Sequence, residues 1–365
     1  MIGTEVRGIR MPMFKEGSNV KDIVIENLFK TGLEFKEKDV ICITESIVAR
    51  SLGNYVTVDD IAEDVIELFG ENPEVGVMWP IYSRNRFSLI LKGIARAAKR
   101  VVLQLGGTGK DDVGNDLLNQ FTGINIIDFY KNIVEEEDAQ CEIYLDDYSN
   151  TLPDKVKNII VCETHNPENT IELLKPLYGK THNFVTPKDL CNKQKAGRKG
   201  WNEDYGLYGS NKAGEELLKL FPRTVDCMNL VNSIQEEIKN KTGVNIEVMI
   251  YGDGCFKDPI CGIWEFADPV VSPGYTSGLE GVPGELKIKY LLDNDLKDNE
   301  NLESELKQRI KTKDDNLVGK MSSQGTTPRR YVDLLGSLAD LTSGSGDKGT
   351  PVVWISGYFK NYSED

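Results

Sequence analysis

Apolar positions in the first hundred residues recur with the spacing of helices and strands. Residues 20–32 and 57–70 place apolar side chains every three or four positions and end at a glycine, which predicts two amphipathic helices. Between them, residues 41–43 form an apolar run typical of a buried strand, and residues 44–46 would turn that strand into a helix. The pattern predicts mixed helices and strands in this part of the chain.

The middle of the chain alternates apolar runs with helical patterns. The expected strands are residues 100–105, 141–147, 158–164 and 182–187. The expected helices are residues 117–121, 127–137 and 170–179. Because such alternation is typical of α/β units, we expect residues 85–200 to form an inserted α/β region between an N-terminal part, 1–84, and a C-terminal part, 201–365.

The last third of the chain opens with a polar, glycine-punctuated segment, 193–211, which predicts a long loop. Helices are expected at 213–222 and 227–243, and a strand that runs into a turn at 244–256. Charge-dense residues 291–318 predict a solvated helix or an excursion. The closing segment, 331–359, predicts a helix, a glycine-rich loop and a buried strand.

Composition narrows the class of protein. The 365 residues are 39% hydrophobic and 28% charged, which is ordinary for a globular protein of one or two domains. No apolar run approaches the ~20 residues of a membrane span, and the first 17 residues lack a signal-peptide core, so we expect a cytoplasmic protein without a membrane partner. The net charge of −15 opposes nucleic-acid binding but leaves room for a local basic pocket.

Cysteine and histidine patterns argue against two common kinds of site. The seven cysteines include no C-x-x-C pair, which predicts reduced thiols. The two histidines lie outside zinc-binding patterns, so a zinc hydrolase or a serine-triad enzyme is poorly supported.

The stretch "VVLQLGGTGKDDVGND", residues 101–116, invites comparison with a phosphate-binding P-loop. Such a loop needs a glycine where this chain has Gln104 and a hydroxyl where it has Asp111, so both requirements fail. The stretch therefore predicts another kind of ligand loop or a plain turn. A second glycine-rich loop, 343–351, would let its backbone approach a ligand closely or would serve as a flexible connector.

Four separated stretches, residues 8–20, 38–53, 208–256 and 337–357, together resemble, in this order, the coenzyme F420-0:L-glutamate ligase (gamma-glutamyl ligase) family. The resemblance implies an α+β fold with mixed β-sheets, a homodimer, and bound GTP or ATP with Mg²⁺ or Mn²⁺. It also implies an amide ligase that activates a small carboxylate or phosphorylated substrate as an acyl phosphate. The amine of an amino acid then attacks this intermediate.

The same resemblance implies the residues of the site. Those expected at the nucleotide are Met11, Pro12, Met13, Phe14, Glu45, Ser46, Arg50, Ser210, Asn211, Gly344, Gly346 and Gly349. Arg50, where the family has a lysine, and Asp253 are expected to be catalytic. The expected metal ligands are Asp253, Asp204 and Asp347.

Departures from the family pattern leave other hypotheses open. Tyr208, Gly252 and Ser345 stand at family metal positions, which favours a nucleotide- or metabolite-binding protein that has lost ligase activity. A further alternative is a phosphotransferase or NTPase centred on residues 85–200, with Lys110 at the nucleotide. Asp112 and Asn115 also reproduce the family's D-x-x-N spacing, although the sequence after Ser210 and Asn211 fits better.

Several candidate residues also have a simpler interpretation. Glu45 and Ser46 would merely cap a helix, and Asn211 would be a helix N-cap. Asp253 would be a hairpin turn residue, Arg50 a surface residue, and the arginines of "RNRF", 84–87, a solvated pair rather than a phosphate site.

Overall fold

The computed structural model describes most of the chain. The described residues are 3–81, 84–105, 126–145, 151–162, 167–257, 264–297, 300–314, 316–317, 319–324, 326, 330–343 and 347–364. Within these ranges, only the backbone is described for residues 253–257, 264–271 and single positions 84, 126 and 343.

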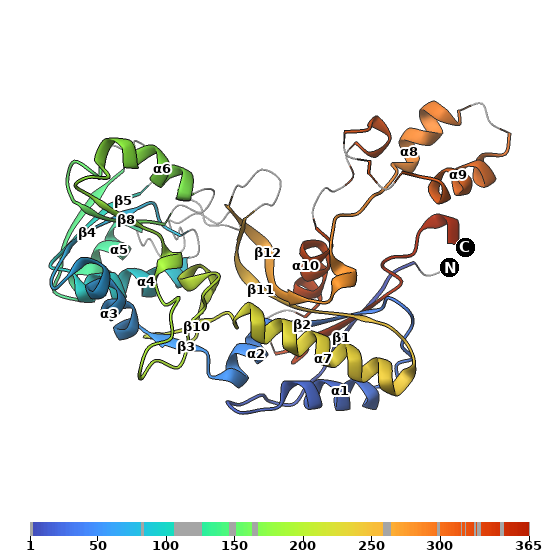
Figure 1. Cartoon of the computed structure of the whole chain (residues 1–365), viewed down its shortest axis with the longest axis horizontal. Helices are drawn as coiled ribbons and strands as arrows, with labels where there is room; N and C mark the ends of the chain where they lie inside the picture. The colour runs from blue at the N-terminus through green and yellow to red at the C-terminus, as the bar shows by residue number, and fades with distance from the viewer. Residues whose placement is uncertain are drawn as a thin grey trace.

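A mixed five-stranded sheet, ordered β1-β13-β2-β11-β12, forms the centre of the protein (Figure 1). Its strands are β1 (Glu5–Ile9), β2 (Val40–Thr44), β11 (Glu247–Lys257), β12 (Trp264–Tyr275) and β13 (Val352–Ser356). Strands β2 and β11 pair in parallel, and the other neighbours pair antiparallel. The helices that cover it are α1 (Val20–Lys30), α7 (Thr224–Thr242) and α10 (Tyr331–Ser343).

Strand β2 shows why its sequence is apolar at almost every position. Ile41 and Ile43 pack into the core shared with α1 and α7, whereas Val40 and Cys42 pack on the α10 side. Because alternate side chains of a strand point to opposite faces, a strand covered on both faces is apolar throughout. The strand predicted at 41–43 and the helices predicted at 20–32 and 227–243 are confirmed.

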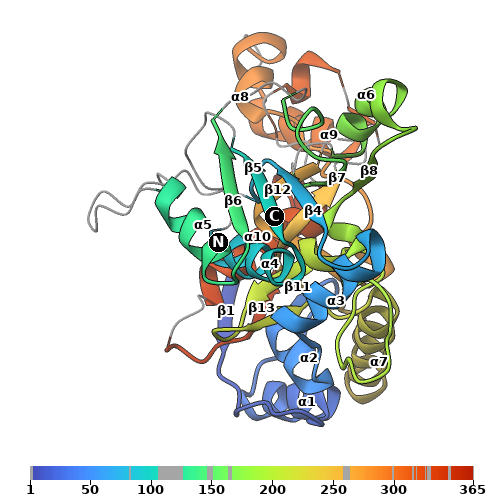
Figure 2. The same cartoon turned by 90° about the vertical axis from the view of Figure 1, so that its left-hand side faces the viewer.

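A second, fully parallel sheet has the order β6-β5-β4-β7-β8 and faces the viewer in Figure 2. Its strands are β4 (Glu74–Met78), β5 (Arg100–Gln104), β6 (Gln140–Tyr144), β7 (Asn158–Val161) and β8 (Asn183–Val185). Its helices are α3 (Val58–Phe69), α4 (Arg84–Ala97), α5 (Ile126–Glu135) and α6 (Pro167–Tyr178). The predicted α+β fold with an α/β region is confirmed, and the parallel sheet already includes β4, which precedes residue 85.

The parallel sheet is doubly wound. Helices α3, α4 and α5 pack against one face of the sheet, and α6 packs against the opposite face. The chain moves outward from β4 through β5 to β6, then returns to the other side of β4 as β7. The switch point of the sheet, where ligands bind in doubly wound folds, therefore lies between β4 and β7.

A small antiparallel sheet, β3-β10-β9, lies between the two larger sheets. Its strands are β3 (Tyr55–Thr57), β9 (Ser210–Lys212) and β10 (Leu217–Leu220). The helix predicted at 213–222 is wrong, because Leu218 and Leu220 alternate inward along β10 and the strand pairs with both neighbours. The loop predicted at 193–211 contains a 3-10 turn at Gly206–Gly209 and ends where β9 begins.

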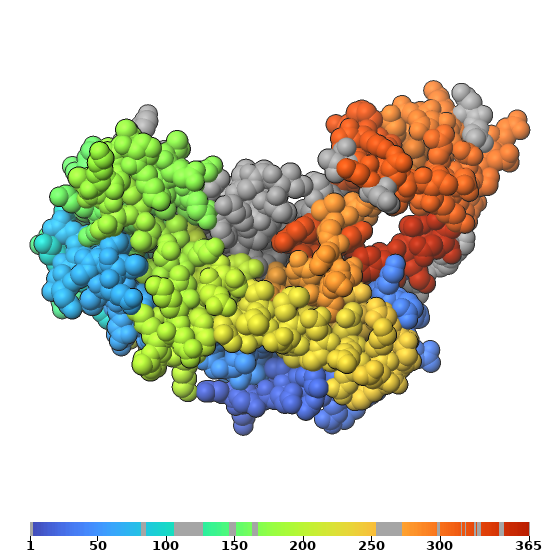
Figure 3. Space-filling model, in the orientation of Figure 1, coloured from blue at the N-terminus to red at the C-terminus, as the bar shows by residue number. Residues whose placement is uncertain are grey.

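The remaining elements are short. Helix α2 (Glu45–Leu52) follows β2, and α8 (Ile288–Tyr290), a π-helical turn (Leu291–Asp295) and α9 (Leu302–Lys311) form an arm that projects from the body (Figure 3). This arm confirms the excursion expected at 291–318. The other 3-10 turns are Pro187–Asp189, Ser277–Leu279, Met321–Ser323 and Tyr362–Glu364.

Two further findings concern the described residues only. The cysteines whose side chains are described, Cys42, Cys141, Cys162, Cys191 and Cys227, are all free thiols, as predicted. Among the described helices, none combines the length and the apolar character that crossing a membrane requires.

Candidate functional site

The site begins where β2 passes directly into α2. Thr44 is the N-cap of this helix, since its Oγ1 accepts a hydrogen bond from the Ser46 N–H at 3.4 Å. The helix ends at Gly53, whose φ of 65° is the left-handed conformation of a helix C-cap. Because Thr44 supplies the cap, the side chains of Glu45 and Ser46 are available for other contacts.

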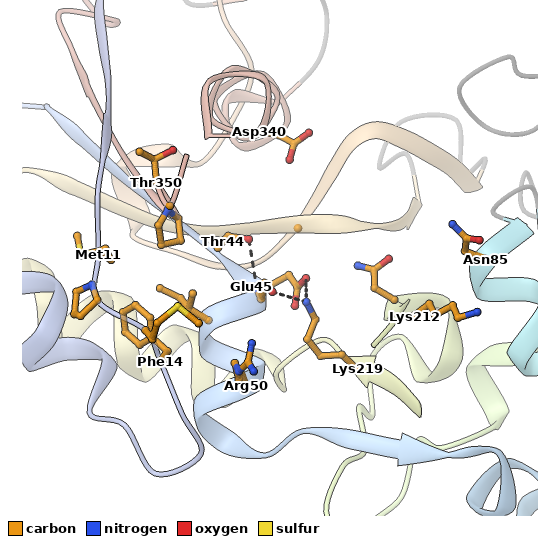
Figure 4. Close-up of a pocket in the computed structure, with 18 of the residues that line it drawn as sticks. Met11, Phe14, Thr44, Glu45, Arg50, Asn85, Lys212, Lys219, Asp340 and Thr350 are labelled. Carbon is orange, nitrogen blue, oxygen red and sulfur yellow. Dashed lines mark hydrogen bonds and ion pairs between the residues drawn. The ribbon is translucent and has the colours of Figure 1, made fainter. Parts of the chain in front are cut away.

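These side chains open into a cavity of about 640 Å³, a size typical of small-molecule sites (Figure 4). The walls come from the N-terminal segment, the β2–α2 junction, α4, β9, β10, β11, α10 and the segment before β13. The lining residues are Met11, Pro12, Met13, Phe14, Thr44, Glu45, Ser46, Ile47, Arg50, Asn85, Arg86, Asn211, Lys212, Lys219, Gly252, Asp340, Gly349, Thr350 and Pro351.

An ion pair occupies the middle of the cavity. The Nζ of Lys219 lies 3.0 Å from Oε1 of Glu45 and donates a hydrogen bond to Ser46 Oγ at 2.7 Å. The Glu45 side chain is only 3% exposed and that of Lys219 13%. A Cβ at Gly252 would lie 1.8 Å from Cγ of Glu45, so glycine at this position of β11 leaves the space that Glu45 fills.

The electrostatic balance of the described lining differs from that of the whole chain. Four basic residues, Arg50, Arg86, Lys212 and Lys219, face it beside two acidic ones, Glu45 and Asp340. The lining is thus positive within a chain of net charge −15. A concave site with excess positive charge concentrates anionic ligands.

The N-terminal segment forms one end of the cavity. The Met11 N–H donates to the Gly349 carbonyl at 3.1 Å, which joins this segment to the one before β13. Phe14 is 4% exposed and packs into the core under the central sheet, whereas Met13 is 79% exposed. The buried Phe14 anchors the segment, and the exposed Met13 offers an apolar surface to a ligand.

Many residues that the sequence predicted for the site lie at this cavity. They are Met11, Pro12, Met13, Phe14, Glu45, Ser46, Arg50, Asn211 and Gly349. Ser210 is not in the lining, because its buried Oγ donates to the Leu207 carbonyl at 2.6 Å. Gly344 and Gly346 lie outside the described residues.

The predicted metal ligands do not converge in the described part of the chain. Asp204 lies outside the lining, and its buried Oδ2 has no hydrogen-bond partner among the described residues. Asp347 is exposed in a turn, and the side chain of Asp253 is not described. Within the described ranges, no three acidic, histidine or cysteine side chains form a metal-binding cluster.

Several polar residues of the lining were missed by the sequence prediction, among them Lys219, Lys212, Asn85 and Asp340. Lys219 was assigned to a helix, and the run of Leu217, Leu218, Leu220 and Phe221 around it lacks the alternation that would have marked a strand. Lys212, Asn85 and Asp340 carried no recognisable signal.

Two of the simpler interpretations are wrong. Arg86 is 2% exposed and donates from Nη1 to the Tyr208 carbonyl at 2.9 Å, so it is not a solvated arginine. Asn211 lies in β9 and does not cap a helix. Of the stretch 101–116, residues 101–104 belong to β5, whereas residues 106–116, with Lys110, Asp112 and Asn115, lie outside the described residues, as does the helix predicted at 117–121.

The model of the F420-0:gamma-glutamyl ligase family matches residues 8–357, nearly the whole chain. The chain belongs to this family. The four stretches that resembled the family by sequence all contribute to the lining of one cavity, although they are far apart in the chain. Membership in the gamma-glutamyl ligase family supports a ligase that acts on small molecules.

No curated protein matches this ligase-family chain. Two solved structures show weak likeness. A tetrameric eIF2B-beta2-delta2 complex from C. thermophilum shares 11% identity over 38% of this chain and 46% of its own, with a TM-score of 0.25. A biosynthetic arginine decarboxylase from Campylobacter jejuni shares 12% identity over 96% of this chain and 65% of its own, with a TM-score of 0.16. The chain spans less than two thirds of either one.

Proposed function

We propose that this protein is a nucleoside-triphosphate- and metal-dependent amide ligase that joins an amino acid to a small carboxylate substrate. The observation that supports the proposal is the convergence of four separated family stretches on one positive cavity. A ligase of this kind must hold a triphosphate beside a carboxylate, and cationic side chains stabilise the charge of both.

The cavity has residues suited to both the base and the phosphates of the nucleotide. Met11, Pro12, Met13 and Phe14 would contact the base, and Arg50 and Lys219 the phosphates. The substrate carboxylate oxygen attacks the γ-phosphorus while the bond to the β-phosphate oxygen breaks, which releases the nucleoside diphosphate. The amine then attacks the acyl carbon, loses a proton and expels inorganic phosphate.

A divalent metal would accompany the nucleotide. Mg²⁺ is commonly held by one or two carboxylates together with substrate phosphates, and Glu45 and Asp340 are the carboxylates of the described lining. Bound Mg²⁺ or Mn²⁺ would neutralise charge on the transferred phosphoryl group. We also propose a contribution from Asp253, which directly follows the lining residue Gly252.

Isothermal titration with GTP and with ATP, each in the presence of MgCl₂ or MnCl₂, tests the proposal. The wild-type protein should bind at least one triphosphate, and Arg50→Ala should weaken binding about tenfold through the loss of a charged contact. Lys180→Ala is the matched control, since Lys180 is exposed and outside the lining. Absence of binding to every nucleotide–metal pair would refute a nucleotide-dependent ligase.

The variant Lys110→Ala separates this proposal from an NTPase centred on residues 85–200. The cavity described above does not need Lys110, so nucleotide affinity should stay within about twofold of wild type, a change of less than half a kcal/mol. Loss of nucleotide binding in Lys110→Ala would favour the alternative.

A second candidate is a nucleotide-binding protein without ligase activity. It is favoured by the absence of a three-ligand metal cluster among the described residues and by glycine at 252. Hydroxylamine separates the two candidates, because it traps an acyl phosphate as a hydroxamate. A ligase forms hydroxamate when nucleotide, metal and an acid substrate are present, whereas a binding protein forms none. We also propose a homodimer, which light scattering of the purified protein would test.

A further inference from the structure

The lining of the cavity includes two residues that do not belong to the family-like stretches. Asn85 and Arg86 lie outside residues 8–20, 38–53, 208–256 and 337–357, which supply the rest of the lining. Both belong to the first turn of α4, the helix that follows β4 of the parallel sheet. The parallel-sheet region therefore contributes directly to the site.

This helix turn lies where doubly wound folds bind ligands. Helix α4 begins beyond the carboxyl end of β4, beside the switch point between β4 and β7. Its first residues face the cavity, so the partial positive charge of the helix N-terminus adds to that of the side chains.

A buried contact fixes this end of the cavity. Arg86 donates to the Tyr208 carbonyl at 2.9 Å, and Tyr208 lies in the 3-10 turn that leads into β9. The contact holds the start of α4 against the segment that carries Asn211 and Lys212. Two cations and two amide side chains are thereby gathered from two parts of the chain.

Figure 4 shows the arrangement along the cavity. Asn85 and Lys212 lie at one end and Met11 and Phe14 at the other, with the Glu45–Lys219 pair between them. If the nucleotide base occupies the Met11 end, its triphosphate points toward Lys219. The Asn85–Lys212 end then remains for the second substrate.

We propose that Asn85, Arg86, Asn211 and Lys212 form a subsite for an anionic group, carboxylate or phosphate, of the acid substrate. This inference rests on the proposed function for the position of the nucleotide. Amide donors and cations bind such groups through charge-assisted hydrogen bonds. The parallel-sheet region thus determines which acid the ligase accepts.

Titration with three small probes, without nucleotide, tests the subsite. 3-Phosphoglycerate carries both anionic groups, D-glycerate only the carboxylate and glycerol 3-phosphate only the phosphate. The wild-type protein should bind at least one, and the pattern identifies the preferred group. Lys212→Glu and Asn85→Ala alter exposed side chains, so both variants should fold.

Lys212→Glu should weaken binding of the preferred probe by about tenfold or more, because it reverses a contacting charge, and Asn85→Ala should weaken it less. The GTP affinity of both variants should change less than about twofold. Lys180→Glu, an equal charge change on an exposed residue outside the lining, should leave probe binding unaltered.

Three results would overturn the subsite. They are failure of all three probes to bind the wild type, unchanged probe affinity in Lys212→Glu, or an equal loss of GTP and probe affinity. The nucleotide-free titration keeps the two proposals distinguishable. Absence of binding to every nucleotide–metal pair, with probe binding retained, would reject the ligase function and leave the anion subsite standing.

Discussion

Glu45, Lys219 and Gly252 depend on one another at the centre of the cavity. The carboxylate of Glu45 is buried and lies 3.0 Å from the Lys219 ammonium group, while its methylene groups fill the space above Gly252. Burying a charge is costly unless a partner of opposite charge is present. The buried Glu45 side chain therefore requires both Gly252, which leaves space for it, and Lys219, which balances its charge.

Replacement of Gly252 by alanine should displace Glu45. The new Cβ would lie 1.8 Å from Glu45 Cγ, and such overpacking typically costs about 1–3 kcal/mol. Urea unfolding of Gly252→Ala measures the loss. Gly3→Ala is the control, because a Cβ there meets no atom within 4 Å, and its stability should match wild type. Equal stability of both variants would contradict the packing described.

Loss of the Lys219 charge should be more harmful than loss of both charges. Lys219→Met leaves Glu45 buried without this ion pair, which typically costs about 3 kcal/mol or more. The double variant Glu45→Gln/Lys219→Met should recover part of that stability, since no buried charge remains. Chemical denaturation of wild type and the single and double variants gives the coupling energy. Strictly additive losses would show that the pair does not interact.

At the scale of elements, one carboxylate ties the end of the parallel-sheet region back to α3. Asp64 of α3 accepts hydrogen bonds from Arg198 Nη2 at 2.7 Å and from the Cys191 N–H at 2.6 Å, and it pairs with Lys195. Burial acts to raise the pKa of Asp64, but hydrogen bonds from Arg198, Lys195 and Cys191 together lower it below its usual value. The segment after β8 is held in place by this charge.

The lowered pKa of Asp64 predicts how stability depends on pH. An acidic group whose pKa is lower in the folded than in the unfolded state stabilises the fold at pH values above its unfolded-state pKa, which is about 3.9 for Asp. This contribution disappears as the pH falls through the folded-state pKa. Asp64→Asn should therefore be less stable than wild type at pH 7, and the difference should shrink below about pH 4.

Denaturant unfolding between pH 3 and pH 7 measures this difference. Glu63→Gln on the same helix is the matched control, because it removes the charge of an exposed carboxylate instead of a buried one. A stability difference that stays constant with pH would contradict a charged Asp64 in the folded state.

At the scale of the whole molecule, a positive cavity lies within a strongly acidic chain. The described lining has two more basic than acidic residues, against a net charge of −15 overall. Distant acidic surfaces repel an anionic ligand, and the cavity attracts it at short range. Added salt screens both the distant repulsion and the attraction by the cavity, although the contacts inside the cavity are made at close range.

Nucleotide affinity should fall as salt concentration rises, because anions of the salt compete for the cavity and screen its cations. We expect a loss of about tenfold between 0.05 and 0.5 M NaCl. Titrations at several salt concentrations give the slope. Arg50→Ala should have a shallower slope than wild type, and Lys180→Ala an unchanged one. Affinity that does not change with salt would argue against phosphate recognition by these cations.

Elements whose signals are local could be predicted from the sequence alone. Thr57 and Asp60 form a capping box at the start of α3, and the apolar run of β2 marks a buried strand. The capping hydrogen bonds join residues three positions apart, and the apolar run is continuous, so a short window of sequence contains both signals. The family-like stretches likewise identified Met11, Arg50 and Asn211, which lie at the cavity.

Contacts between segments that are distant in the chain became visible only in the folded protein. Leu218 and Leu220 form a strand because β3 and β9 pair with β10 on its two sides. In this register Leu218 lies opposite Val56, 162 positions earlier in the chain. Arg86 reaches the cavity because it bonds to Tyr208, 122 residues further on. Such contacts depend on packing of the whole chain, and no local pattern of side chains encodes them.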